Sequence, residues 1–289
     1  RAIKSNEYAA ASRLSFSLSQ STTSLETSLE IDMARGGDSC DDSGVQLLVT
    51  GIGDAFSAEH FGSSGLVEAP EGLIAIDCPG SVLAMYRSAV EVSGVPVDID
   101  QIDDILLTHL HGDHSNGLET FGFFRRYISE KSSRPRLHAL PEVLARVWEK
   151  LAPAMDGATK GTGGTSTLED YFEPCPMTPG RGFDVAGLDV SCRRTRHSVP
   201  TAGLLIRGGD GCLAWSGDSE FEQAHIDWLS VADCIVHECG DHFKHTRWTE
   251  LDMLPAGLKA KIRLIHLPDG AEVPSGPMRP LKQGEVISI

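Results

Sequence analysis

The feature that most constrains this sequence is a run of potential metal ligands directly after a short apolar segment. Residues 105–108, Ile-Leu-Leu-Thr, are typical of a buried strand, and the six residues that follow include His109, His111, Asp113 and His114. Side chains two residues apart on a strand share a face, so His109 and His111 are expected to point the same way. Imidazole nitrogens and carboxylate oxygens suit Zn²⁺, with Mn²⁺ or Fe²⁺ as alternatives. The pattern therefore predicts a metal centre at the end of a strand.

Four potential ligands in one loop cannot surround a single tetrahedral ion, so other segments must supply further ligands. Three candidates each follow a predicted strand: His197, Asp218 and His266. Taken alone, each of them could equally be a polar residue that caps an element or lies satisfied in the core.

From residue 45 onward the chain alternates short apolar runs with turns that contain Gly or Pro. We expect strands such as 45–50, and hairpins whose turns lie at 70–72 and 208–211. Helices are expected at several places, among them 248–258. Strand-rich halves with interspersed helices predict an α/β sandwich of two sheets covered by helices. The segment 153–187 is rich in Gly, Pro and Thr, and is expected to be a long loop, which could act as a lid.

Residues 1–44 differ from the rest of the chain because they are rich in Ser and Thr and end in a polar, glycine-bearing joint. We expect 1–44 to be a weakly ordered tail and 45–289 to be the catalytic domain. Residues 1–32 precede Met33, a plausible start, so they could be upstream sequence, a transit-like peptide or a native tail. Seven cysteines without a CxxC pair are typical of free thiols in a reducing compartment. No apolar run reaches the ~18 residues of a membrane span, so we expect a soluble, cytoplasmic protein.

The ordered set of ligands resembles that of the metallo-β-lactamase superfamily, from Val45 to the C-terminus. The resemblance implies a four-layer αββα sandwich that holds two divalent metal ions. It implies the following ligands: His109, His111 and His197 for one ion; Asp113, His114 and His266 for the other; Asp218 as the bridge between them. Asp77, which follows the apolar residues 74–76, is implied to orient a ligand histidine from outside the inner ligand set.

Within the superfamily the closest similarity is to the ribonuclease Z-like branch. It is carried by the segment 50–56, Thr-Gly-Ile-Gly-Asp-Ala-Phe, and by His245-Thr246. The resemblance implies that His245 donates a proton to the leaving group, and it makes Asp113 and His245 the expected catalytic residues. Thr246 is expected to cap the helix that follows. We interpret the neighbouring His237 and His242 as structural.

The identities of the ligands favour hydrolysis. Redox relatives with two irons carry a carboxylate where this sequence has His111, and the commonest zinc β-lactamases carry a Cys where it has Asp218. Two ions ~3.5–4 Å apart lower the pKa of a bridging water, and the resulting hydroxide would attack a phosphorus or carbonyl centre. Arg194 or Arg196 could stabilise the developing charge, or could simply be solvated. We expect a dinuclear phosphodiesterase. The alternatives are a lactone, ester or thioester hydrolase, a tRNA-processing ribonuclease, and a metal-bearing binding protein without catalysis.

The charge of the chain limits the size of the substrate. There are 25 Lys and Arg against 41 Asp and Glu, which gives a net charge of −16 and disfavours a long nucleic acid. Only 21 positions separate His197 from Asp218, which leaves room for a hairpin but not for the long arm of tRNA-processing relatives. We therefore expect a small anionic substrate, such as a cyclic nucleotide or cyclic phosphate. The relatives are often dimers, which makes a homodimer possible.

Overall fold

The computed structural model describes residues 44–157 and 164–289, and within these ranges two seven-stranded sheets face each other. Across the first sheet the strands are β14 (Val286–Ser288), β1 (Gln46–Gly51), β2 (Ser64–Ala69), β3 (Gly72–Ile76), β4 (Ile102–Leu106), β5 (Arg136–Ala139) and β6 (Glu173–Pro176). Across the second they are β13 (Arg279–Pro280), β12 (Ile262–Ile265), β11 (Cys234–Glu238), β10 (Gly211–Trp215), β9 (Ala202–Gly208), β8 (Leu188–Arg194) and β7 (Gly182–Val185).

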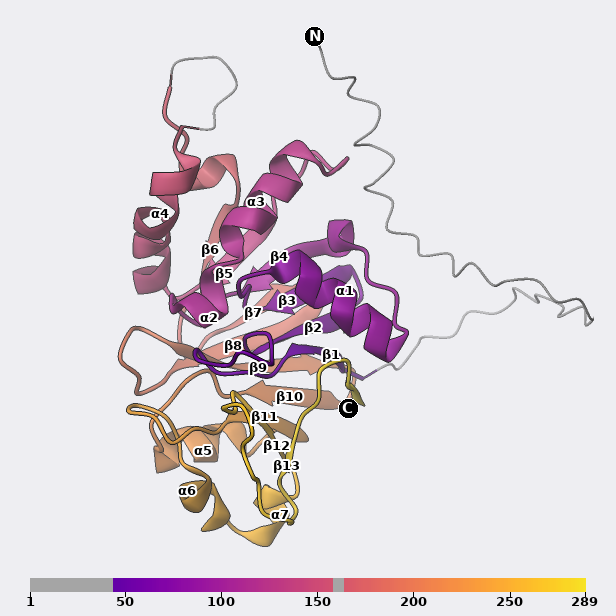
Figure 1. Cartoon of the computed structure of the whole chain (residues 1–289), viewed down its shortest axis with the longest axis vertical. Helices are drawn as coiled ribbons and strands as arrows, with labels where there is room; N and C mark the ends of the chain where they lie inside the picture. The colour runs from indigo at the N-terminus through magenta and orange to yellow at the C-terminus, as the bar shows by residue number, and fades with distance from the viewer. Residues whose placement is uncertain (1–43, 158–163) are drawn as a thin grey trace, which may run out of the picture. The chain divides into compact units, whose positions relative to one another are not determined.

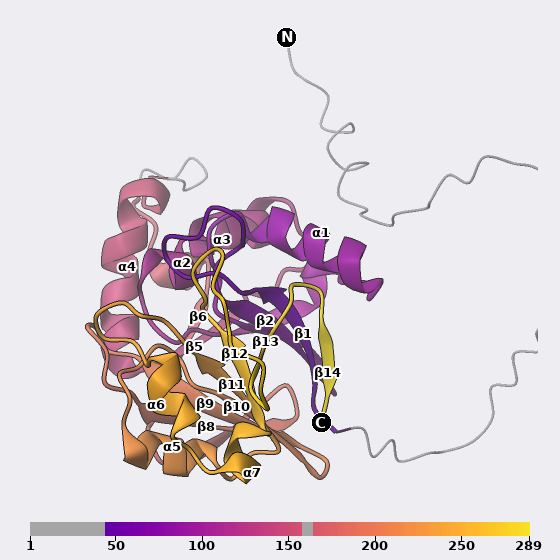
Figure 2. The same ribbon diagram turned by 60° about the horizontal axis from the view of Figure 1, so that its bottom comes forward.

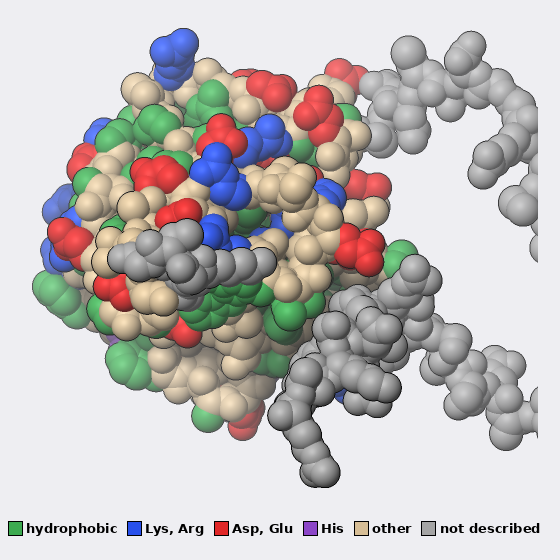
Figure 3. Space-filling model, turned by 90° about the horizontal axis from the view of Figure 1, so that it is seen from above, with side chains coloured by type: hydrophobic (Ala, Val, Ile, Leu, Met, Phe, Trp, Pro, Cys, Tyr) green, Lys and Arg blue, Asp and Glu red, His purple; other side chains and the backbone are tan. Residues whose placement is uncertain are grey.

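Helices cover the outer face of each sheet (Figure 1). Over the first sheet lie α1 (Val82–Ser93), α2 (Gly112–Ser115), α3 (Leu118–Tyr127) and α4 (Pro141–Met155). The short 3-10 helices η1 (Ile99–Gln101) and η2 (Leu168–Asp170) precede β4 and β6. Over the second sheet lie α5 (Gln223–Leu229), α6 (Trp248–Asp252) and α7 (Ala256–Lys259). The predicted four-layer αββα sandwich is therefore confirmed. On the face formed by α1, α3 and α4, Lys and Arg side chains are interspersed with Asp and Glu (Figure 3).

Helix α1 shows why these segments form the outer layers. Its buried residues are Val82, Met85, Tyr86 and Ala89, a spacing of three, four and seven that places one apolar stripe against the sheet. The helix ends at Gly94, whose φ of 74° lets its N–H bond the carbonyl of Val90. No helix among residues 44–157 and 164–289 is both long and apolar enough to cross a bilayer.

Parallel pairing brings the ends of several strands to one edge of the molecule. Strands β3, β4, β5 and β6 are mutually parallel, with helices in the connections between them. In the second sheet β10, β11 and β12 are parallel as well. Because parallel strands end at the same edge, the loops after β3, β4, β10, β11 and β12 gather there (Figure 2).

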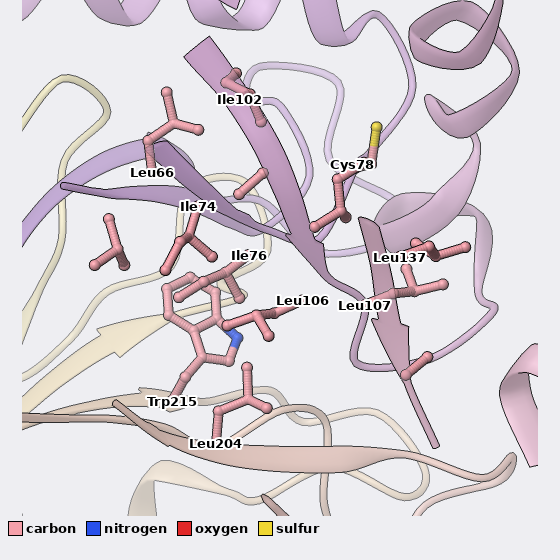
Figure 4. Packing of buried hydrophobic residues seen from close by; sticks show 14 of the residues in the cluster. Leu66, Ile74, Ile76, Cys78, Ile102, Leu106, Leu107, Leu137, Leu204 and Trp215 are labelled. Carbon is pink, nitrogen blue, oxygen red and sulfur yellow. The ribbon is translucent and has the colours of Figure 1, made fainter. Parts of the chain in front are cut away.

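The main core lies between the two sheets. Trp215 of β10 is 2% exposed and lies with Leu204 of the same sheet against Ile74, Ile76 and Leu106 of the first sheet (Figure 4). A second apolar cluster packs α5 and α6 against the outer face of the second sheet. Six described cysteines are free thiols, and all of them except Cys175 are buried.

Three segments differ from the elements expected from the sequence or lie outside the described residues. The expected loop 153–187 is wrong in its described part, since α4 continues to Met155 and η2, β6 and β7 follow. Strand β6 has the sequence Glu-Pro-Cys-Pro, and its prolines are tolerated because it is the edge strand of its sheet. The helix expected at 248–258 is two short helices, α6 and α7, because Pro255 cannot continue the first. The tail expected at 1–44 lies, apart from Gly44, outside the described residues.

Candidate metal centre

The loop after β4 is held to the end of β3 by one buried carboxylate. Asp77 accepts hydrogen bonds from the backbone N–H and the hydroxyl of Thr108, at 2.7 and 2.9 Å. It also accepts one from Nδ1 of His114 at 2.8 Å. Burial raises the pKa of Asp77, although His114 and Thr108 act in the opposite direction. Asp77 thus fixes the start of the loop and the ring of His114 together.

The imidazole rings of His109 and His197 are oriented by bonds from the nitrogen that does not face the centre. Nδ1 of His109 donates to Thr108 Oγ1 at 2.9 Å, because that hydroxyl already donates to Asp77. Nδ1 of His197 donates to the carbonyl of Lys244 at 3.1 Å. Each bond leaves the opposite Nε2 as a lone-pair donor. This is the arrangement that metal-binding histidines require.

Asp218 lies between two groups of side chains. Gly217, with a φ of 59°, makes the tight turn after β10, where an added Cβ would lie 2.3 Å from the carbonyl oxygen of Ala202. The carboxylate of Asp218 is 3.6 Å from Nε2 of His109 and 3.7 Å from that of His197. On its other side it is 3.4 Å from Nε2 of His114 and 3.6 Å from that of His266. One carboxylate therefore touches both groups.

The structure brings all seven predicted ligands together in two sets that share Asp218. One set is His109, His111, His197 and Asp218; the other is Asp113, His114, Asp218 and His266. In each set the potential ligand atoms lie within 4.8 Å of one another.

These residues fit two divalent ions. Ligand atoms around a tetrahedral ion with bonds of ~2.0–2.1 Å are about 3.3 Å apart, close to the separations from Asp218. Nε2 of both His109 and His114 is buried without a hydrogen-bond partner, which is costly unless another group binds there. Burial holds the pKa of His109 well below its ordinary value, so its ring is neutral and ready to bind a cation. Burial also opposes charge on His266, but Asp218 and Asp113 raise its pKa to about 9.

His245 lies against both ligand sets. Its ring stacks on that of His266 with centroids 4.9 Å apart, and it meets the ring of His197 edge-on at 5.1 Å. The expected capping role of Thr246 is wrong, since its hydroxyl donates to the carbonyl of Ser219 and Arg247 caps α6. Thr246 instead ties the segment of His245 to the turn that carries Asp218.

Glu238 is a buried residue of this region that the sequence analysis missed. It is the last residue of β11, and its Oε1 accepts bonds from Ser219 N at 2.8 Å, Thr246 N at 3.2 Å and Nδ1 of His245 at 3.2 Å. Burial raises the pKa of Glu238 well above its ordinary value. The signal was present in the sequence, since a carboxylate ends the buried run Cys-Ile-Val-His-Glu, as Asp77 follows Leu-Ile-Ala-Ile.

Lys150 was missed as well, because nothing in an amphipathic helix marks it. From α4 its Nζ donates to the carbonyl of Leu110 at 2.9 Å and to Ser115 Oγ at 2.6 Å, across the loop of ligands. Arg194 and Arg196 are both held in ion pairs. Their exposed guanidinium groups pair with Glu142 at 2.5 Å and Glu220 at 3.4 Å respectively.

The sequence profile described as anti-Pycsar protein Apyc1 matches residues 45–287. The chain belongs to this family. The Apyc1 protein of Saccharibacillus brassicae is 30% identical over 259 residues, which cover 85% of this chain and 100% of the relative. The Apyc1 protein of Bacillus phage 010DV004 is 27% identical over 260 residues, which cover 83% of this chain and 96% of the relative.

Solved structures share the fold at low sequence identity. The metallo-β-lactamase fold protein YhfI of Bacillus subtilis superposes with a TM-score of 0.67 at 18% identity, over 84% of this chain and 99% of that one. Yeast PDE1 gives 0.61 at 12% identity, over 86% and 100%. As a member of the Apyc1 family with the metallo-β-lactamase fold, the chain is a phosphodiesterase-like, metal-dependent hydrolase. Its cluster of His and Asp is of the kind that binds divalent metal ions.

Proposed function

We propose that this chain is a dinuclear phosphodiesterase that opens a small phosphodiester, a cyclic nucleotide. One observation carries the proposal. The two ligand sets share Asp218, and the His245–Glu238 pair lies against rings of both sets. Two cations and a proton donor side by side are what hydrolysis of an anionic diester with a poor leaving group requires.

In this proposal His109, His111 and His197 hold one ion, Asp113, His114 and His266 hold the other, and Asp218 binds both. Mixed nitrogen and oxygen ligands favour zinc, with manganese or iron as alternatives. When bound, the ions supply Lewis-acid chemistry: they lower the pKa of a bound water toward neutrality and stabilise negative charge on the phosphoryl oxygens.

We assign to His245 the role of donating a proton to the leaving oxygen. Hydrolysis of a cyclic phosphodiester adds a water oxygen to phosphorus and breaks one bond from phosphorus to a ribose oxygen. That oxygen departs as an alkoxide, a strong base, unless it is protonated as the bond breaks. Glu238 accepts the Nδ1 hydrogen of His245, so Nε2 is the nitrogen that can carry a proton to the substrate. Glu238 is a positioning residue because it acts through His245.

The substrate is proposed to be small for two reasons. Between His197 and Asp218 the chain forms only the hairpin of β9 and β10, whose strands pair from Leu204–Trp215 to Gly208–Gly211. A long arm that could grip RNA is therefore not built at this place. The net charge of −16 opposes binding along a polyanion, whereas two divalent ions can hold a single phosphate locally.

The experiment measures the rate of turnover of a panel of substrates. The protein is first depleted of metal and then reconstituted with two equivalents of zinc or manganese. The panel contains pyrimidine and purine cyclic nucleotides, bis-p-nitrophenyl phosphate, a lactone, a thioester and a precursor tRNA. We expect turnover of cyclic nucleotides that depends on added metal and is lost in Asp113→Ala. Turnover of the lactone or thioester alone would favour the carboxylic-ester alternative. A metal-loaded protein inactive on the whole panel would overturn the proposal.

A further inference from the structure

Two unusually exposed phenylalanines stand on the loops beside His245 and His266. Phe56 is 77% exposed and Phe243 is 84% exposed, although phenylalanine is normally among the buried residues. The ring of Phe56 meets that of His242 at a centroid distance of 5.2 Å and an angle of 66°, an edge-to-face contact. Nζ of Lys244 lies 5.0 Å from the centre of the Phe243 ring. We call Phe56, His242 and Phe243 the aromatic rim.

The loop that carries Phe56 is tied to the loop after His266. The backbone N–H of Asp54 donates to the carbonyl of Leu267 at 3.3 Å, and that of Leu267 donates to Ile52 at 3.1 Å. The carboxylate of Asp269 accepts the N–H groups of Ala58 at 2.7 Å and Glu59 at 3.2 Å. Figure 2 shows the two loops side by side, in indigo and yellow.

The same loop also packs against the other ligand loop. Gly62 lies so close to Asp113 that an added Cβ would be 2.3 Å from the carbonyl oxygen of Asp113. The backbone N–H of Phe56 donates to Asp54 Oδ1 at 2.9 Å, which fixes the turn at the tip. The loop that carries Phe56 is therefore held between the loop of Asp113 and the loop that follows His266.

The loop that carries His242 and Phe243 lies beside the loop that carries Phe56. Nε2 of His242 is 3.4 Å from Asp54 Oδ2, which joins this loop to the loop of Phe56. The carbonyl of His242 accepts the N–H of His245 at 3.3 Å, and the carbonyl of Lys244 accepts Nδ1 of His197. His242 and Phe243 of the aromatic rim thus lie in the same turn as His245, the proposed proton donor.

We propose that the aromatic rim stacks the base of a nucleotide whose phosphodiester lies at the metal centre. The inference rests on the proposed phosphodiesterase activity and adds what recognises the rest of the substrate. Flat aromatic faces beside a phosphate site suit a base because stacking is favourable for every base and needs no defined hydrogen-bond pattern. The loop of Phe56 and the loop after His266 also carry Glu59 and Asp269 at the surface, so a second copy of this acidic chain would meet like charge there. A single base is therefore the occupant we assign.

The test compares two diesters with the same leaving group, thymidine 5′-(p-nitrophenyl phosphate) and methyl p-nitrophenyl phosphate. Both release p-nitrophenolate, and only the first carries a base. For Phe56→Ala we expect kcat/KM on the thymidine diester to fall about tenfold through a higher KM, with the methyl diester unchanged. Phe243→Ala should act in the same direction, and Phe56→Tyr should retain activity because it keeps a ring.

The control is Met253→Ala, since Met253 is also 77% exposed but lies just after α6. It should leave both diesters unchanged. Equal losses of Phe56→Ala on the two diesters would assign Phe56 a structural role and overturn the inference, and so would no loss on either. A change in molar mass by light scattering in Phe56→Ala would make the rim an interface between copies, which also overturns it. If the unmodified protein hydrolyses neither diester, the proposed function fails and the inference fails with it.

Discussion

At the residue scale, the centre depends on partners that hold three of its five imidazoles by the outer nitrogen. His114 bonds Asp77, His109 bonds Thr108, and His197 bonds the carbonyl of Lys244. Such partners fix the tautomer and the angle of the ring, so they act on metal binding without touching the ion. Asp77 serves two of these contacts at once, because it also receives both bonds from Thr108.

Replacing Asp77 by Asn should therefore weaken the centre. Asn can accept only one of these bonds well, and its amide group competes with His114 for the role of donor. We expect metal affinity and kcat/KM to fall about 10- to 100-fold. Metal affinity is measured by competition with a chromophoric chelator. Asp98→Asn is the control, because Asp98 only caps η1 and Asn caps equally well. An Asp77→Asn protein with unchanged metal affinity would contradict the role given to this residue.

His245 can be tested through the leaving group. For His245→Ala we expect turnover of a cyclic nucleotide to fall about 10²- to 10⁴-fold, since its alkoxide needs a proton as it departs. Turnover of bis-p-nitrophenyl phosphate should fall much less, because p-nitrophenolate leaves without protonation. The check is steady-state kcat on both substrates for the variant and the unmodified protein. Equal losses on the two substrates would rule out His245 as the proton donor.

The ligands and their partners differ in how visible they are in the sequence. His109, His111, Asp113 and His114 stand in one loop, so their spacing alone indicates a metal centre. Glu238 could have been found by the rule that applies to Asp77, a carboxylate at the end of a buried strand. Lys150 could not, because its contact with Leu110 depends on how α4 packs and not on any pattern in the helix.

At the scale of elements, α5 carries a buried histidine that couples stability to pH. His225 packs against the second sheet, with Nε2 donating to the carbonyl of Ser216 at 3.1 Å and its ring stacked on Trp228. Burial is the main reason that the pKa of His225 is lowered to about 3. An unfolded histidine binds its proton near pH 6.5, so acid favours the unfolded chain over the folded one.

The sign follows from the lowered pKa. The stabilising contribution of a neutral His225 is present above pH ~6.5 and is lost as the pH falls from there toward ~3. At about pH 5 the loss amounts to about 2 kcal/mol. Urea unfolding at several pH values should therefore show a shallower decline between about pH 7 and pH 5 for His225→Gln than for the unmodified protein. Parallel curves for the two proteins would contradict this account.

Helices and strands were predictable where apolar runs are bounded by turn residues. The strands at the edges of the sheets were harder to predict. Strand β1 and the hairpin of β9 and β10 follow directly from the alternation of apolar runs and glycines. Strand β6 was hidden because two of its four residues are prolines, which argue against a strand unless it is known to lie at the edge. That position is a property of the whole sheet and cannot be read from the four residues.

At the scale of the whole molecule, the centre is assembled from both sheets. The loop with His109 to His114 follows β4 of the first sheet, whereas His197, Asp218 and His266 follow β8, β10 and β12 of the second. The distances within the centre therefore depend on how the two sheets pack. Trp215 is a large side chain in that packing. It lies close to the first sheet, since a Cβ added to Gly65 would be in van der Waals contact with its Cζ3, at 3.6 Å.

Removing Trp215 should affect both stability and metal binding. We expect Trp215→Ala to lower the free energy of unfolding by about 3–5 kcal/mol, because it leaves a large cavity between the sheets. Metal affinity should fall as well, since ligands on the two sheets are no longer held at fixed distances. Urea unfolding and chelator competition measure the two effects. Trp228→Ala, on the outer helix α5, should cost less stability and leave metal affinity unchanged; equal metal affinities in both variants would contradict the coupling.

We propose that two ions share Asp218, and anomalous scattering at the zinc edge from crystals of the zinc-loaded protein is the test of this sharing. We predict two peaks about 3.5–4 Å apart, one on each side of the Asp218 carboxylate. One peak should lie among His109, His111 and His197, and the other among Asp113, His114 and His266. A single peak, or peaks away from these residues, would show that two ions do not share Asp218.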